Sequence, residues 1–133
     1  MNRELKFRGR RKNDGSWIYG DLCRQELTTC IFPQDAYDSY TIIIVDESTV
    51  GQYTGLKDKN GVEIYEGDII IEKIKRSRKD GERLVICFEE FEWKGENVNG
   101  ATTSLSLLAE YHTIEVVGNI HDNPELLIGN HYE

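Results

Sequence analysis

At 133 residues, the chain has the length of one ordinary domain and can bury a core without metal or disulfide staples. Its content of 38% hydrophobic and 10% aromatic residues excludes a disordered chain, and no apolar run approaches the roughly 20 residues that cross a bilayer. The net charge of −8 is uneven, because residues 1–12 carry +5 and residues 73–83 carry +4, so most of the remaining surface is expected to repel nucleic acid.

The cysteines and the N-terminal residues indicate in which cellular compartment the protein is expected. Cys23, Cys30 and Cys87 are odd in number and form no C-x-x-C pair, which predicts free thiols in a reducing compartment. The charged start, MNRELKFRGRRK, has no apolar stretch behind it, so no signal peptide is expected. We therefore expect a cytoplasmic protein without membrane contact. One domain over 1–133 is expected, with subregions 1–50 and 51–133.

The first third of the chain predicts strands joined by turns. The turn residues Asn13-Asp14-Gly15 separate two alternating segments, which predicts a β-hairpin. YTIIIV, at residues 40–45, is β-branched and apolar enough for a strand buried on both faces. The strands expected here cover residues 4–10, 17–23, 27–32 and 40–45.

Turn residues also organise the middle of the chain. Asn60-Gly61 predicts a type I′ hairpin turn, because such a turn needs positive φ at both central residues. Glu66-Gly67-Asp68 predicts a second bend before the apolar run at 69–71. Asp80-Gly81 then returns the chain as a second leg, RLVICFEEFEW (83–93), so we expect a long hairpin with a basic tip.

The end of the chain mixes strand and helix. TTSLSLLAEY (102–111) fits either a strand or a short helix, whereas TIEVVGNI (113–120) predicts a strand. In the tail, Asn123 is a candidate cap, Pro124 suits the first helical position and Gly129 ends the helix. Sustained 3.6-residue periodicity is absent from the first 100 residues, so the sequence predicts a mainly β fold with a small closed or half-open barrel.

Three blocks of the sequence resemble the YopX family of phage and prophage proteins of Gram-positive bacteria. The blocks are ELKFRGRRKNDGSWIYGD at the start, QYTGLKDKNGVEIYEGDII at 52–70, and VVGNIHDNPELL at 116–127. Together they cover nearly the whole chain. The resemblance implies an SH3-like barrel around residues 50–120, an N-terminal β-hairpin region, a short C-terminal helix, and residence in the host cytoplasm. It implies no chemistry and no cofactor.

A candidate binding surface lies in the second block. Aromatic and carboxylate side chains around a barrel mouth commonly bind ligands. The alternative is turn chemistry, in which the same residues satisfy backbone groups and the glycines adopt turn dihedrals. The residues concerned are Tyr53, Thr54, Asp58, Tyr65, Glu66 and Asp68.

The basic hairpin tip is a candidate nucleic-acid site, since a basic β-ribbon can track phosphates. Its candidate contacts are Lys73, Lys75, Arg76, Arg78, Lys79 and Arg83. The alternative is a solubilising cluster that protects a strand edge. The overall pI near 4.9 favours this alternative, because domains that bind nucleic acid are usually basic as a whole.

Signs of catalysis are weak. His112, His121 and His131 lack the paired spacings of structural zinc sites, so no metal is expected. Glu90 and Glu92 are expected to share one strand face as a solvated acidic surface, not as a glycosidase pair. The function expected from these features is a non-enzymatic protein-interaction module that binds another protein or a second copy of itself. The alternative is a nucleic-acid-binding module that uses residues 73–83.

Overall fold

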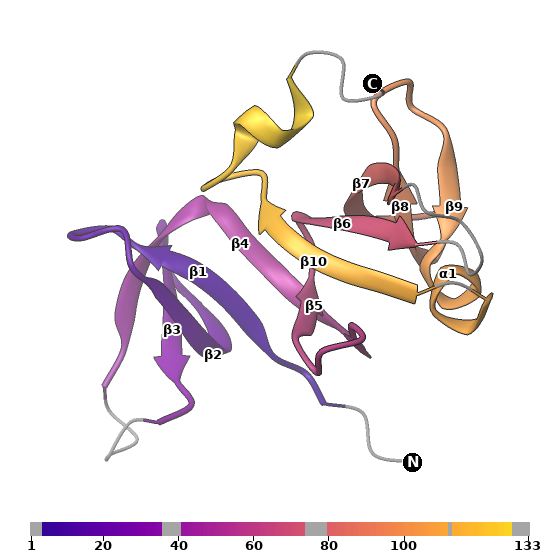
Figure 1. Ribbon diagram of the computed structural model, residues 1–133. Helices are drawn as coiled ribbons and strands as arrows, with labels where there is room; N and C mark the ends of the chain where they lie inside the picture. Colours follow the sequence, from indigo (N-terminus) through magenta and orange to yellow (C-terminus); the bar gives the residue numbers. More distant parts are fainter. Residues whose placement is uncertain (1–3, 36–40, 74–79, 112, 129–133) are drawn as a thin grey trace. The chain divides into compact units, whose positions relative to one another are not determined.

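The computed structural model describes residues 4–35, 41–73, 80–111 and 113–128, and it consists mainly of β-strands (Figure 1). The predicted mainly β fold is confirmed. The chain divides into two compact units, Met1–Gly55 and Leu56–Glu133.

Four antiparallel strands form a barrel-like ring in the first unit (Figure 1). They are β1 (Phe7–Arg11), β2 (Trp17–Gln25), β3 (Thr28–Pro33) and β4 (Ile43–Lys57). Each pairs with the next, and β1 also pairs with β4, with Phe7 opposite Gln52, so the strands close on themselves. The interior is tight, because a Cβ at Gly9 would lie 3.1 Å from Val45 and 3.3 Å from Ile31.

The ring lies elsewhere in the chain than the resemblance implied. A barrel was expected around residues 50–120, whereas the ring is built from strands within residues 7–57. The reason is the length of β4, whose 15 residues pair with β1, with β3 and with the short β5 (Glu63–Tyr65). The block at 52–70 therefore leaves the ring instead of forming its centre.

The second unit contains an antiparallel sheet in the order β10-β6-β7-β8-β9. Its strands are β6 (Asp68–Lys73), β7 (Asp80–Glu89), β8 (Glu92–Glu96), β9 (Thr102–Ser104) and β10 (Thr113–Asn119). The helix α1 (Leu105–Tyr111) adds Leu105 and Leu108 to a core of buried aliphatic side chains. The other members of this core are Ile64, Ile70, Leu84, Ile86 and Ile114. Burial of apolar surface of this kind is the main stabilising contribution to the unit.

Both helical segments differ in part from expectation. The segment that fitted either a strand or a helix forms both, β9 followed by α1. The tail forms a short 3₁₀ helix, η1 (Pro124–Leu127), with Pro124 at its start as predicted. Asn123 does not cap it, because its side chain instead accepts a hydrogen bond from the backbone N–H of Asn119 at 3.2 Å. Neither helix in the described part of the chain is long and apolar enough to cross a bilayer.

One predicted turn and two predicted strands need correction. The Asn60-Gly61 turn has positive φ only at Gly61 (82°), which is the pattern of a three-residue hairpin loop and not of a type I′ turn. Residues 83–93 are not one strand, because a turn at Glu90-Phe91 divides them into β7 and β8. The run at 40–45 is not buried on both faces, since Ile44 is 50% exposed.

Candidate functional site

The predicted binding surface in the second block is largely buried. Glu66 is exposed and Thr54 is half-buried. The remaining four side chains, Tyr53, Asp58, Tyr65 and Asp68, are buried. A binding role for this set stays a prediction, and Glu66 and Thr54 are the members that a partner can reach.

Both carboxylate oxygens of Asp58 accept hydrogen bonds from backbone N–H groups. Its Oδ1 accepts hydrogen bonds from the N–H groups of Asn60 at 2.8 Å and Val62 at 2.9 Å. Its Oδ2 accepts a third from the N–H of Val116, on β10, at 2.9 Å. One side chain therefore closes the 58–62 turn and ties it to a strand 58 residues away in sequence.

Asp68 acts in the same way at the following bend. Its Oδ2 accepts a hydrogen bond from the N–H of Tyr65 at 2.7 Å, across the predicted bend, in which Gly67 has φ of 89°. The hydroxyl of Tyr65 donates to Glu63 at 3.2 Å. Hydrogen bonds to backbone N–H groups thus give a sufficient reason for aspartate at positions 58 and 68, in keeping with the turn-chemistry alternative.

The candidate nucleic-acid contacts fall mostly outside the described residues. Lys73 ends β6 and Arg83 lies in β7, where both are half-buried. Lys75, Arg76, Arg78 and Lys79 lie outside the described residues. Nucleic-acid binding by this hairpin therefore stays a prediction.

Groups suited to metal binding or thiol chemistry are few in the described ranges. No cluster of three or more His, Cys, Asp or Glu side chains suited to a metal ion occurs among those residues. The cysteines are free thiols. Burial, together with the carboxylates of Glu89 and Glu96, raises the pKa of the Cys87 thiol. A higher pKa lowers the thiolate fraction at neutral pH, which makes Cys87 a poor nucleophile.

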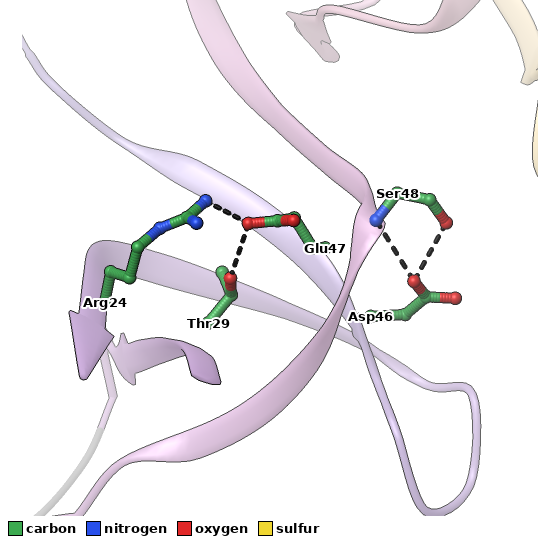
Figure 2. Close-up of polar contacts among 5 residues, drawn as sticks. All are labelled: Arg24, Thr29, Asp46, Glu47 and Ser48. Atoms are coloured by element: carbon green, nitrogen blue, oxygen red, sulfur yellow. Dashed lines mark hydrogen bonds and ion pairs between the residues drawn. The ribbon is translucent and has the colours of Figure 1, made fainter. Parts of the chain in front are cut away.

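A bulge in β4 supports the first unit. Arg8 pairs with Gly51 and Arg10 with Asp46, so residues 47–50 protrude opposite a single residue of β1. The Oδ1 of Asp46 accepts hydrogen bonds from the N–H and hydroxyl of Ser48 at 3.0 and 2.8 Å. The opposite side of the strand carries Glu47, which contacts Arg24 of β2 and Thr29 of β3 (Figure 2). The bulge therefore links β4 to the β2–β3 hairpin.

The hydroxyl of Thr49 replaces the ladder bond that the bulge removes. It donates to the Asp46 carbonyl at 2.6 Å and accepts from the Arg10 N–H at 2.9 Å, and Thr49 is buried. We expect Thr49→Val to lower the free energy of unfolding by about 1–3 kcal/mol, because it removes the hydroxyl that accepts from the part-buried Arg10 N–H and donates to the Asp46 carbonyl. Urea unfolding measures this change. Thr49→Ser keeps the hydroxyl and should recover most of the loss; an equal loss in both variants would contradict this role.

The turn between β7 and β8 displays an exposed aromatic side chain. Phe91 is 97% exposed and sits with Glu90 in a two-residue turn between Glu89 and Glu92, which face each other across the hairpin. Both central residues have positive φ, 52° at Glu90 and 66° at Phe91. This is the φ pattern of a type I′ turn, in which Asn-Gly is the usual pair. We call residues Glu89 to Glu92 the Phe91 tip.

Residues of β7 and β8 next to the Phe91 tip hold the turn in place through an aromatic pair and an ion pair. Phe88 and Trp93 face each other across the strands, edge to face, with ring centroids 5.0 Å apart. Trp93 in turn packs against the core of the second unit. The Lys94 ammonium donates a hydrogen bond to Glu90 at 2.8 Å and so holds the pKa of that carboxyl below its usual value. The tip is therefore an exposed aromatic side chain on a turn that Phe88, Trp93 and Lys94 support.

A second turn repeats this arrangement in the first unit. Glu26 and Leu27 form the two-residue turn between β2 and β3, where Glu26 has φ of 54° and Leu27 is 99% exposed. Every non-glycine residue with positive φ in the described part of the chain lies in one of these two turns. Each unit thus carries a hairpin that pairs a strained glutamate with a fully exposed apolar residue.

Sequence reasoning missed the Phe91 tip because Glu-Phe has none of the turn chemistry of Gly, Asn or Asp. One signal was present. The segment FEEFEW reads aromatic, Glu, then Glu-Phe, then Glu, aromatic, so it is symmetric about the turn. Symmetry of this kind places equal residue types opposite each other in an antiparallel hairpin, as the pairing of Phe88 with Trp93 shows.

Comparison with known proteins identifies the family of the chain and a solved structure with a similar fold. The family model described as YopX protein matches residues 6–128. Among solved structures, the crystal structure of protein EF1440 from Enterococcus faecalis is similar, with a TM-score of 0.60 and 24% identity over 96% of this chain and 100% of that one. That likeness shows a shared fold. No curated protein matches the chain closely enough to count as a relative. The family match spans nearly all of the chain, and the chain therefore belongs to the YopX family.

Proposed function

We propose that the chain is a non-enzymatic protein-interaction module, and that the Phe91 tip is the surface that contacts its protein partner. The observation that supports this most is the combination of strain and exposure at one residue. Phe91 has φ of 66° and is 97% exposed. Left-handed backbone costs a non-glycine residue roughly 1–2 kcal/mol, and strain of this kind is concentrated at functional positions.

The fold itself gives no reason for Phe91, whereas Glu90 at least accepts a hydrogen bond from Lys94. An Asn-Gly pair forms the same turn without strain, and any polar residue is better hydrated than phenylalanine. Phe91 adds nothing to the core, because its ring lies almost wholly in solvent. Aromatic side chains on rigid supports are frequent centres of protein interfaces, where burial of the ring provides much of the binding energy.

The setting of this function is part of the proposal. The YopX resemblance implies a phage or prophage accessory protein, and the free thiols fit a reducing compartment. We therefore place the interaction in the cytoplasm of the bacterial host. Its partner is a protein with an apolar pocket and basic surroundings, since three glutamates surround Phe91 in the tip.

A glycine substitution tests the proposal, because stability and binding are expected to change in opposite directions. Phe91→Gly should raise the free energy of unfolding by about 1 kcal/mol, because glycine adopts the left-handed backbone without strain while Glu90 keeps its hydrogen bond from Lys94. The same variant should lose the partner that the immobilised wild-type chain retains from a bacterial lysate. Urea unfolding and quantitative pull-down measure the two effects.

Leu107→Ala is the matched control. Leu107 is 51% exposed on α1, and alanine favours helix, so this variant removes exposed apolar surface without disturbing a turn. It should keep the partner. The proposal fails if Phe91→Ala retains every protein that the wild-type chain retains, or if the wild-type chain neither retains a protein nor associates with itself.

A further inference from the structure

A hollow on the first unit has the chemistry that the Phe91 tip requires. It measures about 590 Å³ and is lined by Ile42, Ile43 and Ile44 together with Arg11, Lys12 and Asn13. The isoleucines provide an apolar wall at the start of β4, and the polar residues come from the end of β1 and the turn that follows. We call these six residues the Ile44 hollow.

The rim of the Ile44 hollow is basic and incompletely neutralised. Arg11 approaches Asp14 at 3.8 Å, and its Nε is buried without a hydrogen-bond partner among the described residues. Asp14 is itself engaged with Ser16, whose backbone N–H and hydroxyl lower the pKa of the Asp14 carboxyl. Lys12 is exposed and has no ion pair within the described ranges. Two cations thus face one carboxylate at this rim.

The Phe91 tip is complementary to this hollow in polarity and in charge. Its apolar ring matches the isoleucine wall, because transfer of the ring out of water is favourable. The tip contains Glu89, Glu90 and Glu92 and no cation, and its net charge together with the neighbouring Lys94 is −2. An acidic tip and a basic rim attract each other and orient the approach.

We propose that the Phe91 tip of one copy of the chain docks in the Ile44 hollow of a second copy. This inference rests on the proposed function and names the partner of the tip. The contact is heterologous, since the two surfaces consist of different residues, and repeated contacts build closed rings or open chains of copies. A single tip in a single hollow is a small interface, so the association is weak and sensitive to salt.

Mixing two variants tests this contact directly. Phe91→Ala removes the tip and keeps the hollow, whereas Ile44→Asp keeps the tip and places a charge in the hollow. In sedimentation velocity over a concentration series, each variant alone should associate at least about tenfold more weakly than the wild-type chain. An equimolar mixture should form a 1:1 dimer and grow no further, because it contains one intact tip and one intact hollow.

Charge reversal provides a second variant with little risk to folding. Lys12→Glu at the exposed rim should weaken association several-fold, and Glu92→Lys in the same chain should restore it. Raising the NaCl concentration from 0.05 to 0.5 M should weaken the wild-type association as well.

The outcomes separate this inference from the proposed function. A wild-type chain that stays monomeric, a Phe91→Ala variant that associates as the wild type does, or a mixture that forms no dimer overturns docking between copies. If Phe91-dependent capture of another protein persists in those cases, the proposed function stands and the partner is a different protein. Loss of both self-association and Phe91-dependent capture overturns both proposals.

Discussion

Replacing Asp58 by alanine is expected to lower the free energy of unfolding by about 3–5 kcal/mol, one of the largest losses available from one side chain outside the core. The substitution removes the acceptor for the backbone N–H groups of Asn60, Val62 and Val116. Asp58 is buried, so water does not readily replace the carboxylate. Hydrogen bonds to a charged group contribute more than neutral ones, which places the effect above that of a single lost bond. Urea unfolding followed by circular dichroism measures it.

Asp58→Asn separates the turn from the long-range bond. The amide oxygen can still accept from Asn60 and Val62, whereas its NH₂ group cannot accept from Val116. We expect this variant to lose about half as much stability as Asp58→Ala. Amide hydrogen exchange at Val116 should accelerate in both variants. An Asp58→Ala variant as stable as the wild type would show that the carboxylate does not hold β10.

Gly20→Ala is expected to destabilise the first unit by about 3 kcal/mol or more, because there is no space for a methyl group at this point of β2. A Cβ at Gly20 would lie 1.8 Å from the carbonyl oxygen of Phe32 and 3.0 Å from the backbone nitrogen of Gln34. Both atoms belong to the backbone, so no side-chain rotation relieves the overlap. The β2–β3 pairing must open locally, and thermal unfolding of the variant should begin at a lower temperature.

Gly15→Ala is the control for this substitution. Gly15 has φ of 76° but nothing within 4 Å of an added Cβ, so alanine there incurs only the cost of left-handed backbone, about 1 kcal/mol. A comparable loss at both positions would mean that the close approach of Phe32 to Gly20 is not what makes glycine necessary.

Local patterns were sufficient to predict most strands. The apolar run at 69–71 and the segment TIEVVGNI correspond to β6 and β10, which pair antiparallel. The ring was not predictable in the same way. Its closure depends on pairing between β1 and β4, and no local pattern in either strand specifies a partner so distant in sequence. Pairing over that distance is decided by tertiary packing.

The candidate site was less predictable than the fold. The turn role of Asp58 follows from its residue type, but its bond to Val116 joins segments that share no sequence signal. The Phe91 tip contradicts local turn preference, and its one sequence signal, the symmetry of FEEFEW, does not indicate that Phe91 is exposed or has positive φ. The Ile44 hollow combines residues 11–13 with residues 42–44, which are brought together by the closed ring.

The pairing that closes the ring also determines the order in which the strands can pair while the chain is being translated. β1 and β2 are adjacent in sequence and can form their hairpin as soon as both have left the ribosome. The second edge of β1 cannot pair along its whole length until β4 has emerged as far as Gln52, because the pairing runs from Arg11 with Val45 to Phe7 with Gln52. An unpaired strand edge is a template for pairing with other chains. The nascent first unit is therefore most prone to aggregation in the interval before β4 is made, and in that interval it has most need of a chaperone.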